Sequence, residues 1–342
     1  MTPAAAVTII MPVYNGEAHL SSAVGSILAQ TFTDLTLLII DDGSTDRTAE
    51  IIESFSDHRI TVIRNPHNLG LARSLNIAIS QVKSPYIARM DCDDISCPKR
   101  LEIQIQYMEV HPDIGLCGSY YSAFEAEGGD ETVRRPPLNH GDILYELLFD
   151  NAFGHSTVVF RTDLINRFDL KYDESLKAAQ DYDLWVRMTP HCKVANLPIT
   201  LVRYRCHNDS VSVRHADEQR RIARRVSEFH RTQLGLLPKS DDTEIHQELM
   251  SMNFPESLDK LRRAGDWLSR LLPVALFRCR QPLLSTLFNF NKLWYSACGR
   301  NAASGIIIFI IYIIKPYGFF GNPLYSTKLL YRCLSKSPIT SN

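Results

Sequence analysis

Three carboxylates stand within four residues shortly after an apolar segment. Asp91, Asp93 and Asp94 follow Tyr86–Ala88 closely, and Cys92 separates the first two. Carboxylate oxygens suit hard divalent cations such as Mg²⁺ and Mn²⁺, which proteins commonly share with substrate phosphates. A solvated turn that begins a helix is the alternative. The spacing therefore predicts either a metal and phosphate site or a capped turn.

Two more polar pairs follow apolar runs in the same way. Tyr14 and Asn15 come after the run 7–13, and Asp41 and Asp42 come after the run 35–40. These β-branched runs are typical of buried strands. The predicted strands are VTIIMPV (7–13), LTLLII (35–40), ITVIRN (60–65) and YIARMD (86–91).

The segments between these strands carry apolar residues at helical spacing, such as Leu20, Val24 and Ile27. Strands that alternate with helices predict an α/β fold with a mostly parallel, Rossmann-like sheet flanked by helices. In such sheets ligands bind beyond the carboxyl ends of the strands. The polar groups that follow the strands are therefore expected to meet at one edge.

The remaining sequence predicts a second half of this domain and a different C-terminal region. An amphipathic helix over 101–108 leads to a strand-like segment at 113–124, and 124–139 reads as a mobile loop. We predict a catalytic domain over 1–212, with a nucleotide half at about 1–95 and an acceptor half at about 96–212. Residues 213–342 form a basic, helical region.

Composition excludes several classes of protein. The chain has 342 residues, of which 45% are hydrophobic and 22% charged, so it is neither disordered nor fibrous. A net charge of −1 gives no indication of a nucleic-acid partner. The eight cysteines show no paired C-x-x-C spacing, which argues against zinc or disulfides and favours a cytoplasmic setting. No basic n-region of a signal peptide precedes the first strand.

The C-terminal region is cationic and partly very apolar. From Trp267 onward there is no Asp or Glu, while nine Lys and Arg residues occur. The unbroken apolar run Gly305–Ile314 is too short to cross a bilayer, which takes about 20 residues. These features favour peripheral binding to an anionic membrane, on the inner face of the cell membrane. The alternative is a helical subdomain that packs on the core or on the partner in a homodimer.

Five ordered segments carry a family resemblance. VTIIMPVYN, LLIIDDGSTD, NLGLARSLN, ARMDCDDIS and QDYDLWVRM, in that order, resemble the inverting, nucleotide-sugar-dependent glycosyltransferases of family 2, of the bacterial surface-polysaccharide type. The resemblance covers roughly residues 7–210 and implies the GT-A (nucleotide-diphospho-sugar transferase) fold. It also implies transfer from a UDP-sugar to a hydroxyl of a glycan acceptor, lipid-linked, in O-antigen, capsule or exopolysaccharide synthesis. Mn²⁺ or Mg²⁺ is the implied cofactor.

The resemblance assigns the nucleotide-sugar and metal residues. Asp42 is expected to accept a hydrogen bond from the uracil imide, Asp91 to reach the ribose or sugar, and Asp93 to bind the metal of the D-x-D motif. Asp94 is expected to orient its neighbours or cap the next helix. The remaining nucleotide-side and metal residues are Pro12, Val13 and Tyr14 around the base, Arg73 near the nucleotide, Cys92 as the small middle residue of D-x-D, and His207 at the metal or diphosphate.

The same resemblance assigns the reaction centre. Asp181 matches the general base that takes the proton of the acceptor hydroxyl, and Gln180 stands where the family usually has Glu. A neutral Gln180 leaves the base intact and changes the acceptor contacts. His155 is expected on the acceptor side, and Trp185 either stacks on a sugar or packs in the core.

The sequence argues against three other functions, to different degrees. A sugar-phosphate nucleotidyltransferase shares the α/β architecture, but no Gly-rich, Lys-containing loop follows the first strand. A dinucleotide dehydrogenase lacks its G-x-G-x-x-G in MPVYNGEAHL. A non-catalytic sugar-nucleotide-binding or scaffold protein stays open, although the joint presence of Asp42, Asp91, Asp93 and Asp181 argues against it.

Overall fold

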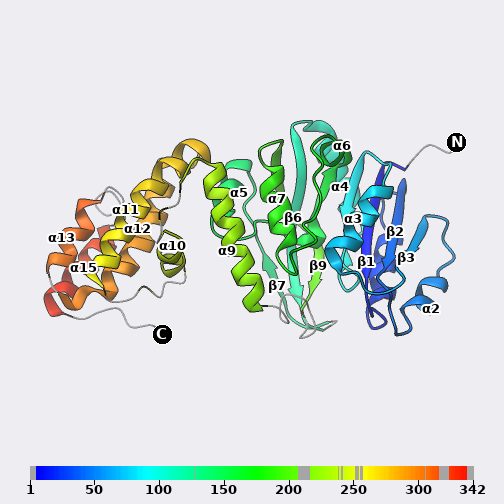
Figure 1. Cartoon of the computed structure of the whole chain (residues 1–342), viewed down its shortest axis with the longest axis horizontal. Coiled ribbons are helices and arrows are strands. Elements are labelled where there is room, and N and C mark those ends of the chain that lie inside the picture. Colours follow the sequence, from blue (N-terminus) through cyan, green and yellow to red (C-terminus); the bar gives the residue numbers. More distant parts are fainter. Residues whose placement is uncertain are drawn as a thin grey trace. The chain divides into compact units, whose positions relative to one another are not determined.

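The computed structural model describes residues 5–126, 128–206, 216–237, 239, 242–250, 254, 257–304, 306–315 and 323–336. The chain forms two compact units, Met1–Val226 and Ser227–Asn342. The division falls inside helix α9 (Ala216–Gln233), whereas the sequence places the end of the first region at about residue 212. Each unit has its own buried residues and is described separately (Figure 1).

The first unit is built on one mixed sheet with the order β3-β2-β1-β4-β8-β6-β9-β5, to which β7 adds beside β6. The four predicted N-terminal strands are present and parallel, with Val13 paired to Asp41 and Ile10 to Arg89. Their carboxyl ends therefore lie at one edge. Their bounds are β1 Val7–Val13, β2 Leu35–Asp41, β3 Ile60–Arg64 and β4 Tyr86–Arg89.

The second half of the sheet brings distant segments beside β4. Strand β8 pairs antiparallel with β4, so that Ala88 lies opposite Val159. The expectation of a loop over 124–139 is only partly right, because Glu131–Arg134 (β7) pairs antiparallel with β6. The remaining strands are β5 Ile95–Ser96, β6 Ile114–Phe124, β8 Val159–Arg161 and β9 Lys193–Arg205.

Helices cover both faces of this sheet. In β1, Val7, Ile9 and Met11 point into one apolar core and Ile10 into the other, as the alternation of a strand requires. Helices α1 and α4 contribute to the first core, and α3 and α7 to the second. The helices of this unit are α1 Leu20–Leu28, α2 Thr48–Glu53, α3 Leu71–Gln81, α4 Arg100–Val110, α5 His140–Glu146, the 3₁₀ turn η1 His155–Thr157, α6 Thr162–Arg167 and α7 Gln180–Met188, followed by α9.

All the regular elements among the described residues of the second unit are helices, as predicted. Trp267 and Trp294 are buried at its centre. None of the helices in the described part of the chain is both long and apolar enough to span a membrane. The elements are α10 Asp242–Met250, α11 Leu258–Pro273, the π-helical turn η2 Val274–Arg278, α12 Leu283–Arg300, the 3₁₀ turn η3 Ala302–Ser304, α13 Ile306–Ile314 and α15 Pro323–Ser335.

Candidate active site

The turn after β4 holds Asp91 by a buried ion pair. The guanidinium of Arg89, whose side chain is 1% exposed, contacts Asp91 Oδ2. The hydroxyl of Ser156 donates to the same oxygen at 2.8 Å, accepts from the Asp91 backbone N–H at 3.1 Å, and also accepts from Arg89 at 3.2 Å. Asp91 Oδ2 therefore binds protein groups, whereas Asp91 Oδ1 is available to bind a ligand.

The same contacts keep Asp91 ionised. Burial by itself would raise its pKa, but the charge of Arg89 and the hydrogen bonds from Arg89 and Ser156 outweigh burial, so the pKa of Asp91 lies below its ordinary value. The side chain of Asp91 is still 28% exposed, so an incoming ligand can reach it. Asp91 therefore presents a fixed negative charge at the sheet edge.

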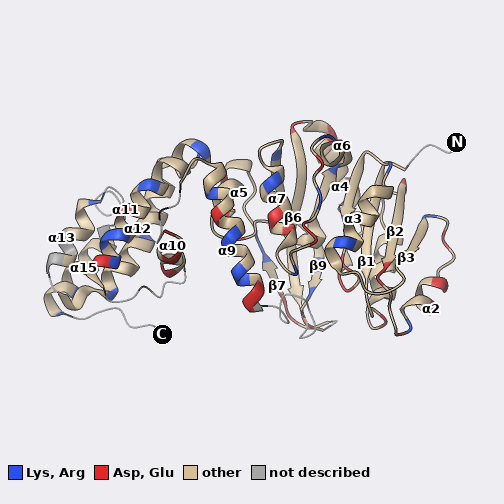
Figure 2. Cartoon of the chain, in the orientation of Figure 1, with Lys and Arg blue, Asp and Glu red and all other residues tan. Residues whose placement is uncertain are grey.

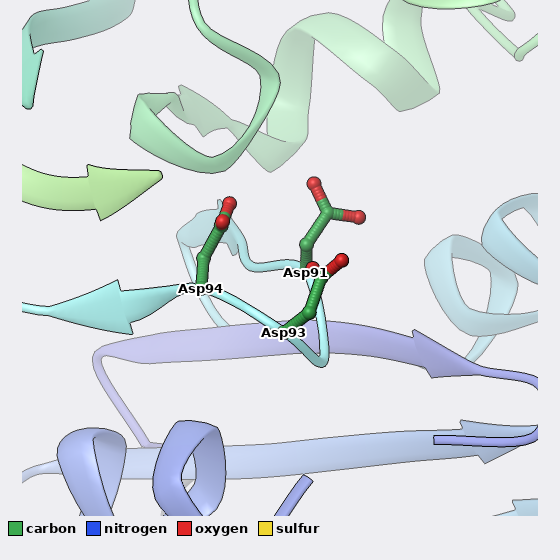
Figure 3. A group of neighbouring side chains, drawn as sticks. All are labelled: Asp91, Asp93 and Asp94. Carbon is green, nitrogen blue, oxygen red and sulfur yellow. The ribbon is translucent and has the colours of Figure 1, made fainter. Parts of the chain in front are cut away.

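Asp93 and Asp94 complete an acidic group with Asp91. One oxygen from each of the three carboxylates lies within 4.8 Å of the others, and the three extend to the same side of the turn (Figure 3). Asp94 is buried and accepts from the backbone N–H of Arg205 at 2.8 Å, while its Oδ2 makes no hydrogen bond. Burial and the charges of Asp91 and Asp93 raise the pKa of Asp94 well above its ordinary value.

These residues fit a hard divalent cation. The donors are all carboxylate oxygens, and a buried carboxylate oxygen without a hydrogen bond is costly unless something positive binds it. Burial and the charges of Asp93 and Asp91 raise the pKa of the Cys92 thiol well above its ordinary value, so Cys92 stays protonated. His207, the other predicted metal ligand, lies outside the described residues.

The loops after β1 and β2 are tied together beside this group. The side chain of Asn15 accepts from the Thr45 N–H at 2.8 Å, while the Asn15 and Gly16 N–H groups donate to Ser44 at 3.0 Å and Thr48 at 2.8 Å. These bonds join two segments about 30 residues apart in the sequence. The two loops therefore form one support for a ligand.

The predicted base-binding residues differ in accessibility. Pro12 and Val13 are buried in β1, whereas the Tyr14 side chain, which follows them, is 48% exposed. Arg73 is exposed on α3 and makes no hydrogen bond or ion pair with any described residue. Tyr14 and Arg73 thus present the groups that a nucleotide could contact.

Asp42 is already engaged within the protein. It is 4% exposed, and its oxygens accept from the Asn65 side chain at 2.7 Å and from the Leu69 and Gly70 N–H groups at 2.8 and 2.9 Å. A carboxylate has about four acceptor positions, so one remains for a further donor. Asp42 therefore shapes the loop after β3, whatever it also does for a nucleotide.

Asp181 lies in the first turn of α7 and is held by Asn151, whose side-chain amide donates to its Oδ2 at 2.7 Å. Burial raises the pKa of Asp181 above its ordinary value. The backbone N–H of Tyr182, the Asn151 bond and the charge of Arg89 offset only part of that effect. A carboxylate with a raised pKa is a stronger base. Because Arg89 acts on both Asp91 and Asp181, the acidic turn and the predicted base lie near each other.

Between them lies a cluster of buried rings. His155 Nε2 lies 2.9 Å from the Tyr172 hydroxyl, and both rings pack against Trp185 at centroid distances of 6.0 and 6.4 Å. Burial and the Arg89 charge lower the pKa of His155 well below its ordinary value, so it is neutral. Trp185 is 0% exposed, and of its two predicted roles the structure shows core packing. Its ring face is closed to a sugar.

Gln180 begins α7 directly before Asp181. It is only 5% exposed, and its Oε1 is buried without a hydrogen-bond partner. The preceding Ala179 has φ = 52°, the left-handed region that non-glycine residues rarely adopt. A strained turn and an unpaired polar atom beside a basic carboxylate are typical of functional sites.

Four residues of this site were not identified from the sequence: Arg89, Asn151, Ser156 and Tyr172. Arg89 lies in ARMDCDD and could have been found as the cation nearest the acidic turn. Ser156 and Asn151 carry no local signal, because only the pairing of β8 with β4 brings their segment to the edge.

Comparison with known proteins identifies the chain. Residues 8–170 match the model of glycosyl transferase family 2. The amylovoran biosynthesis glycosyltransferase AmsE of Erwinia amylovora is 33% identical over 212 residues, which are 60% of this chain and 79% of that protein. The glucosyltransferase WfgD of Escherichia coli, which uses UDP-Glc and a GlcNAc-diphosphoundecaprenol acceptor, is 30% identical over 63% of this chain and 83% of its own.

The fold has a match among solved structures. TarS 1–349 of S. aureus, in complex with UDP-GlcNAc, superimposes with a TM-score of 0.55 over 95% of this chain and 90% of its own, at 15% identity. At that identity the likeness concerns the fold alone, and it confirms the predicted GT-A architecture with a helical C-terminal region. On the sequence and fold together, the chain belongs to glycosyltransferase family 2.

Proposed function

We propose that this protein is an inverting glycosyltransferase that moves a sugar from a UDP-sugar to a hydroxyl of a glycan acceptor, with Asp181 as general base. The observation that carries the proposal is that a buried ion pair with Arg89 fixes Asp91 at the acidic turn, while Asp181 is held by Asn151 in a buried position that raises its pKa. Asp91 is held ionised by Arg89, whereas the pKa of Asp181 is raised. An inverting transfer needs one base on the acceptor side and negative ligands on the donor side, and it needs no second acidic carboxyl group.

The protein's own residues perform the acceptor half of the reaction. The Asp181 carboxylate takes the proton of the acceptor hydroxyl as its oxygen attacks the anomeric carbon. Asn151 fixes the orientation of Asp181 by its bond to Oδ2. The neutral ring of His155 packs against the apolar ring of Trp185, and the two rings keep water and ions away from the buried side of Asp181. The unpaired Oε1 of the buried Gln180 would accept a hydrogen bond from the acceptor.

Asp91, Asp93 and Asp94 would hold Mn²⁺ or Mg²⁺ on the donor side, with His207 as the further predicted ligand. Such an ion supplies Lewis-acid stabilisation of the charge that grows on the departing diphosphate. Tyr14 and the remaining acceptor position of Asp42 would bind the uracil, and Arg73 would contact the nucleotide. These assignments agree with the donor named for WfgD.

We further propose that the acceptor is lipid-linked and that the protein works peripherally on the cytoplasmic face of the cell membrane. The acceptor named for WfgD is a diphosphoundecaprenol. The acid-free, cationic end of this chain supports the location. Binding of the full chain to anionic vesicles is the measurement that checks it.

Release of UDP tests the donor and the metal together. In a screen of UDP-sugars with Mn²⁺ or Mg²⁺, one donor is expected to give UDP release that a chelator abolishes and added metal restores. GDP- and TDP-sugars serve as controls for the base. A protein that binds UDP-sugars but never releases UDP, with any acceptor or with water, would be a non-catalytic binder and would contradict the proposal.

Substitution of Gln180 tests its acceptor role. Gln180→Leu keeps the buried volume but removes one neutral hydrogen bond, which contributes about 0.5–1.5 kcal/mol. The acceptor KM is therefore expected to rise roughly 2- to 12-fold, while the KM for the donor and the slow hydrolysis of the donor stay unchanged. An equal rise in both KM values would instead indicate a general disturbance of α7.

A further inference from the structure

The C-terminal unit exposes several large apolar side chains, and four of them belong to η2 and the first turns of α12. Phe277 and Leu284 are each 78% exposed, Leu283 is 55% exposed, and Phe288 is 44% exposed one turn further along α12. Phe277 lies in η2, and Leu283 and Leu284 are the first two residues of α12, so a connection of four residues, 279–282, separates the two elements. Side chains this exposed bury little of their surface within the unit, and a contiguous group of them marks an interaction surface.

Helix α15 extends this group. The ring of Tyr325 stacks on Phe288 at 6.3 Å and on Tyr295 at 4.6 Å, so the first turn of α15 lies beside the middle of α12. The buried thiols of Cys298 and Cys333 interact further along, so the two helices run in the same direction. Leu324, which is 55% exposed, directly precedes Tyr325 on α15 and so lies in the same turn as the ring that stacks on Phe288. We call Phe277, Leu283, Leu284, Phe288 and Leu324 the apolar tip.

Cations surround the apolar tip and lie on its two helices. Arg278 ends η2 and Arg280 lies in the connection to α12, and Lys292 and Lys328 follow Phe288 and Leu324 by four residues on their helices. All four are exposed, and none has a hydrogen bond or ion pair with the described residues. Helices α12, α13 and α15 contain no Asp or Glu that could neutralise them (Figure 2).

This order of groups matches the layers of a bilayer surface. Apolar side chains at the beginnings of two parallel helices can enter the boundary between headgroups and acyl chains. Lysines one turn behind them then lie at the depth of the lipid phosphates, which their long side chains can reach. In a symmetric contact between two copies of this face, the same four cations would oppose each other without a counter-charge.

We propose that the apolar tip and its four cations form a docking surface for an anionic lipid bilayer. The inference deepens the proposed membrane location and rests on it for its biological role. The surface needs no membrane-spanning segment, since a shallow apolar insertion and electrostatic attraction act together.

Co-sedimentation of the full chain with vesicles tests the docking surface. Vesicles of phosphatidylcholine with 30% phosphatidylglycerol are compared with pure phosphatidylcholine at low and high salt. The native chain is expected to bind the anionic vesicles and to be released by salt. The double variant Phe277→Ser with Leu284→Ser is expected to bind at least tenfold more weakly. Arg278→Ser with Arg280→Ser is expected to lose roughly 5- to 25-fold, at low salt only.

Matched controls replace exposed residues elsewhere. Val110→Ser removes an apolar side chain that is 68% exposed on α4, and Arg262→Ser removes an exposed cation on α11. Both are expected to bind vesicles as the native chain does. A Phe277→Trp variant adds a direct readout, because the three native tryptophans are at most 1% exposed and a blue shift on vesicle addition would report insertion of residue 277.

Two outcomes would overturn the docking surface. One is vesicle binding by the double variant at native strength. The other is a native chain that does not bind vesicles and forms a dimer in light scattering, while the double variant is monomeric. A second copy of the chain would then cover the apolar tip. UDP release is measured on the same samples. Vesicle binding without UDP release contradicts the proposed reaction alone, and UDP release without vesicle binding contradicts the docking surface alone.

Discussion

Replacing Asp181 with Asn is expected to lower kcat for sugar transfer roughly 10²- to 10⁴-fold, the range that a general base contributes. The substitution keeps the volume and the helix position but removes the proton acceptor. Donor KM is expected to stay within about threefold, because Asp181 is assigned to the acceptor side. Residual transfer at the native rate would remove Asp181 from the mechanism.

The dependence of kcat on pH also tests the role of Asp181 as general base. The base works only when ionised, so kcat falls as the pH drops through the pKa of Asp181. Because burial raises that pKa, the acidic limb is expected above the ordinary value of 3.8. Asp181→Asn is expected to abolish this limb. Asp183→Asn is the matched control: Asp183 lies on the same helix and pairs with Arg187 at 2.6 Å, and its loss should leave the limb in place.

Replacing Arg89 with Met is expected to destabilise the first unit by about 3 kcal/mol. Removing one partner of a buried ion pair typically costs 3–5 kcal/mol, and the lower end applies because the Asp91 side chain is 28% exposed and can regain some hydration. The variant also loses the anchor of Asp91 and is expected to bind the donor and metal more weakly. Its unfolding midpoint in urea should fall with little change in slope.

The tryptophan content of the chain gives a clean readout for this test. Trp185 is the one tryptophan of the first unit, so its emission in a Trp267→Phe, Trp294→Phe background reports that unit alone. Arg47→Met is the matched control, since its ion pair with Glu17 is exposed and contributes at most about 1 kcal/mol.

A double variant separates the ion pair from other effects. Arg89→Met with Asp91→Asn should regain part of the lost stability, because no unpaired charge remains, but it should not regain activity. If Arg89→Met unfolds at the native midpoint, the buried pair is not what holds the turn.

The parts of the fold and site that depend on local sequence patterns could be predicted from the sequence. The runs that became β1 to β4 are long and β-branched, and the polar residues after them had to meet at one edge. Ser156 could not be predicted from the sequence. Its hydrogen bond to Asp91 joins residues that are 65 apart in the chain, and it depends on the antiparallel pairing of β8 with β4. The sequence also did not decide whether Trp185 stacks on a sugar or packs in the core. Six of the nine residues of α7 are buried, so the spacing of its apolar residues does not distinguish a buried face from an accessible one.

Asp42 carries a consequence for how enzymes of this kind could change their nucleotide during evolution. Its carboxylate holds the Leu69 and Gly70 N–H groups, so any substitution there alters the loop after β3 together with the base recognition proposed for Asp42. An enzyme that changed its nucleotide preference by first replacing residue 42 would lose the conformation of the loop after β3 and its selectivity for the base in one step. The accessible route starts instead at Tyr14, which is exposed and therefore free to vary before the carboxylate does.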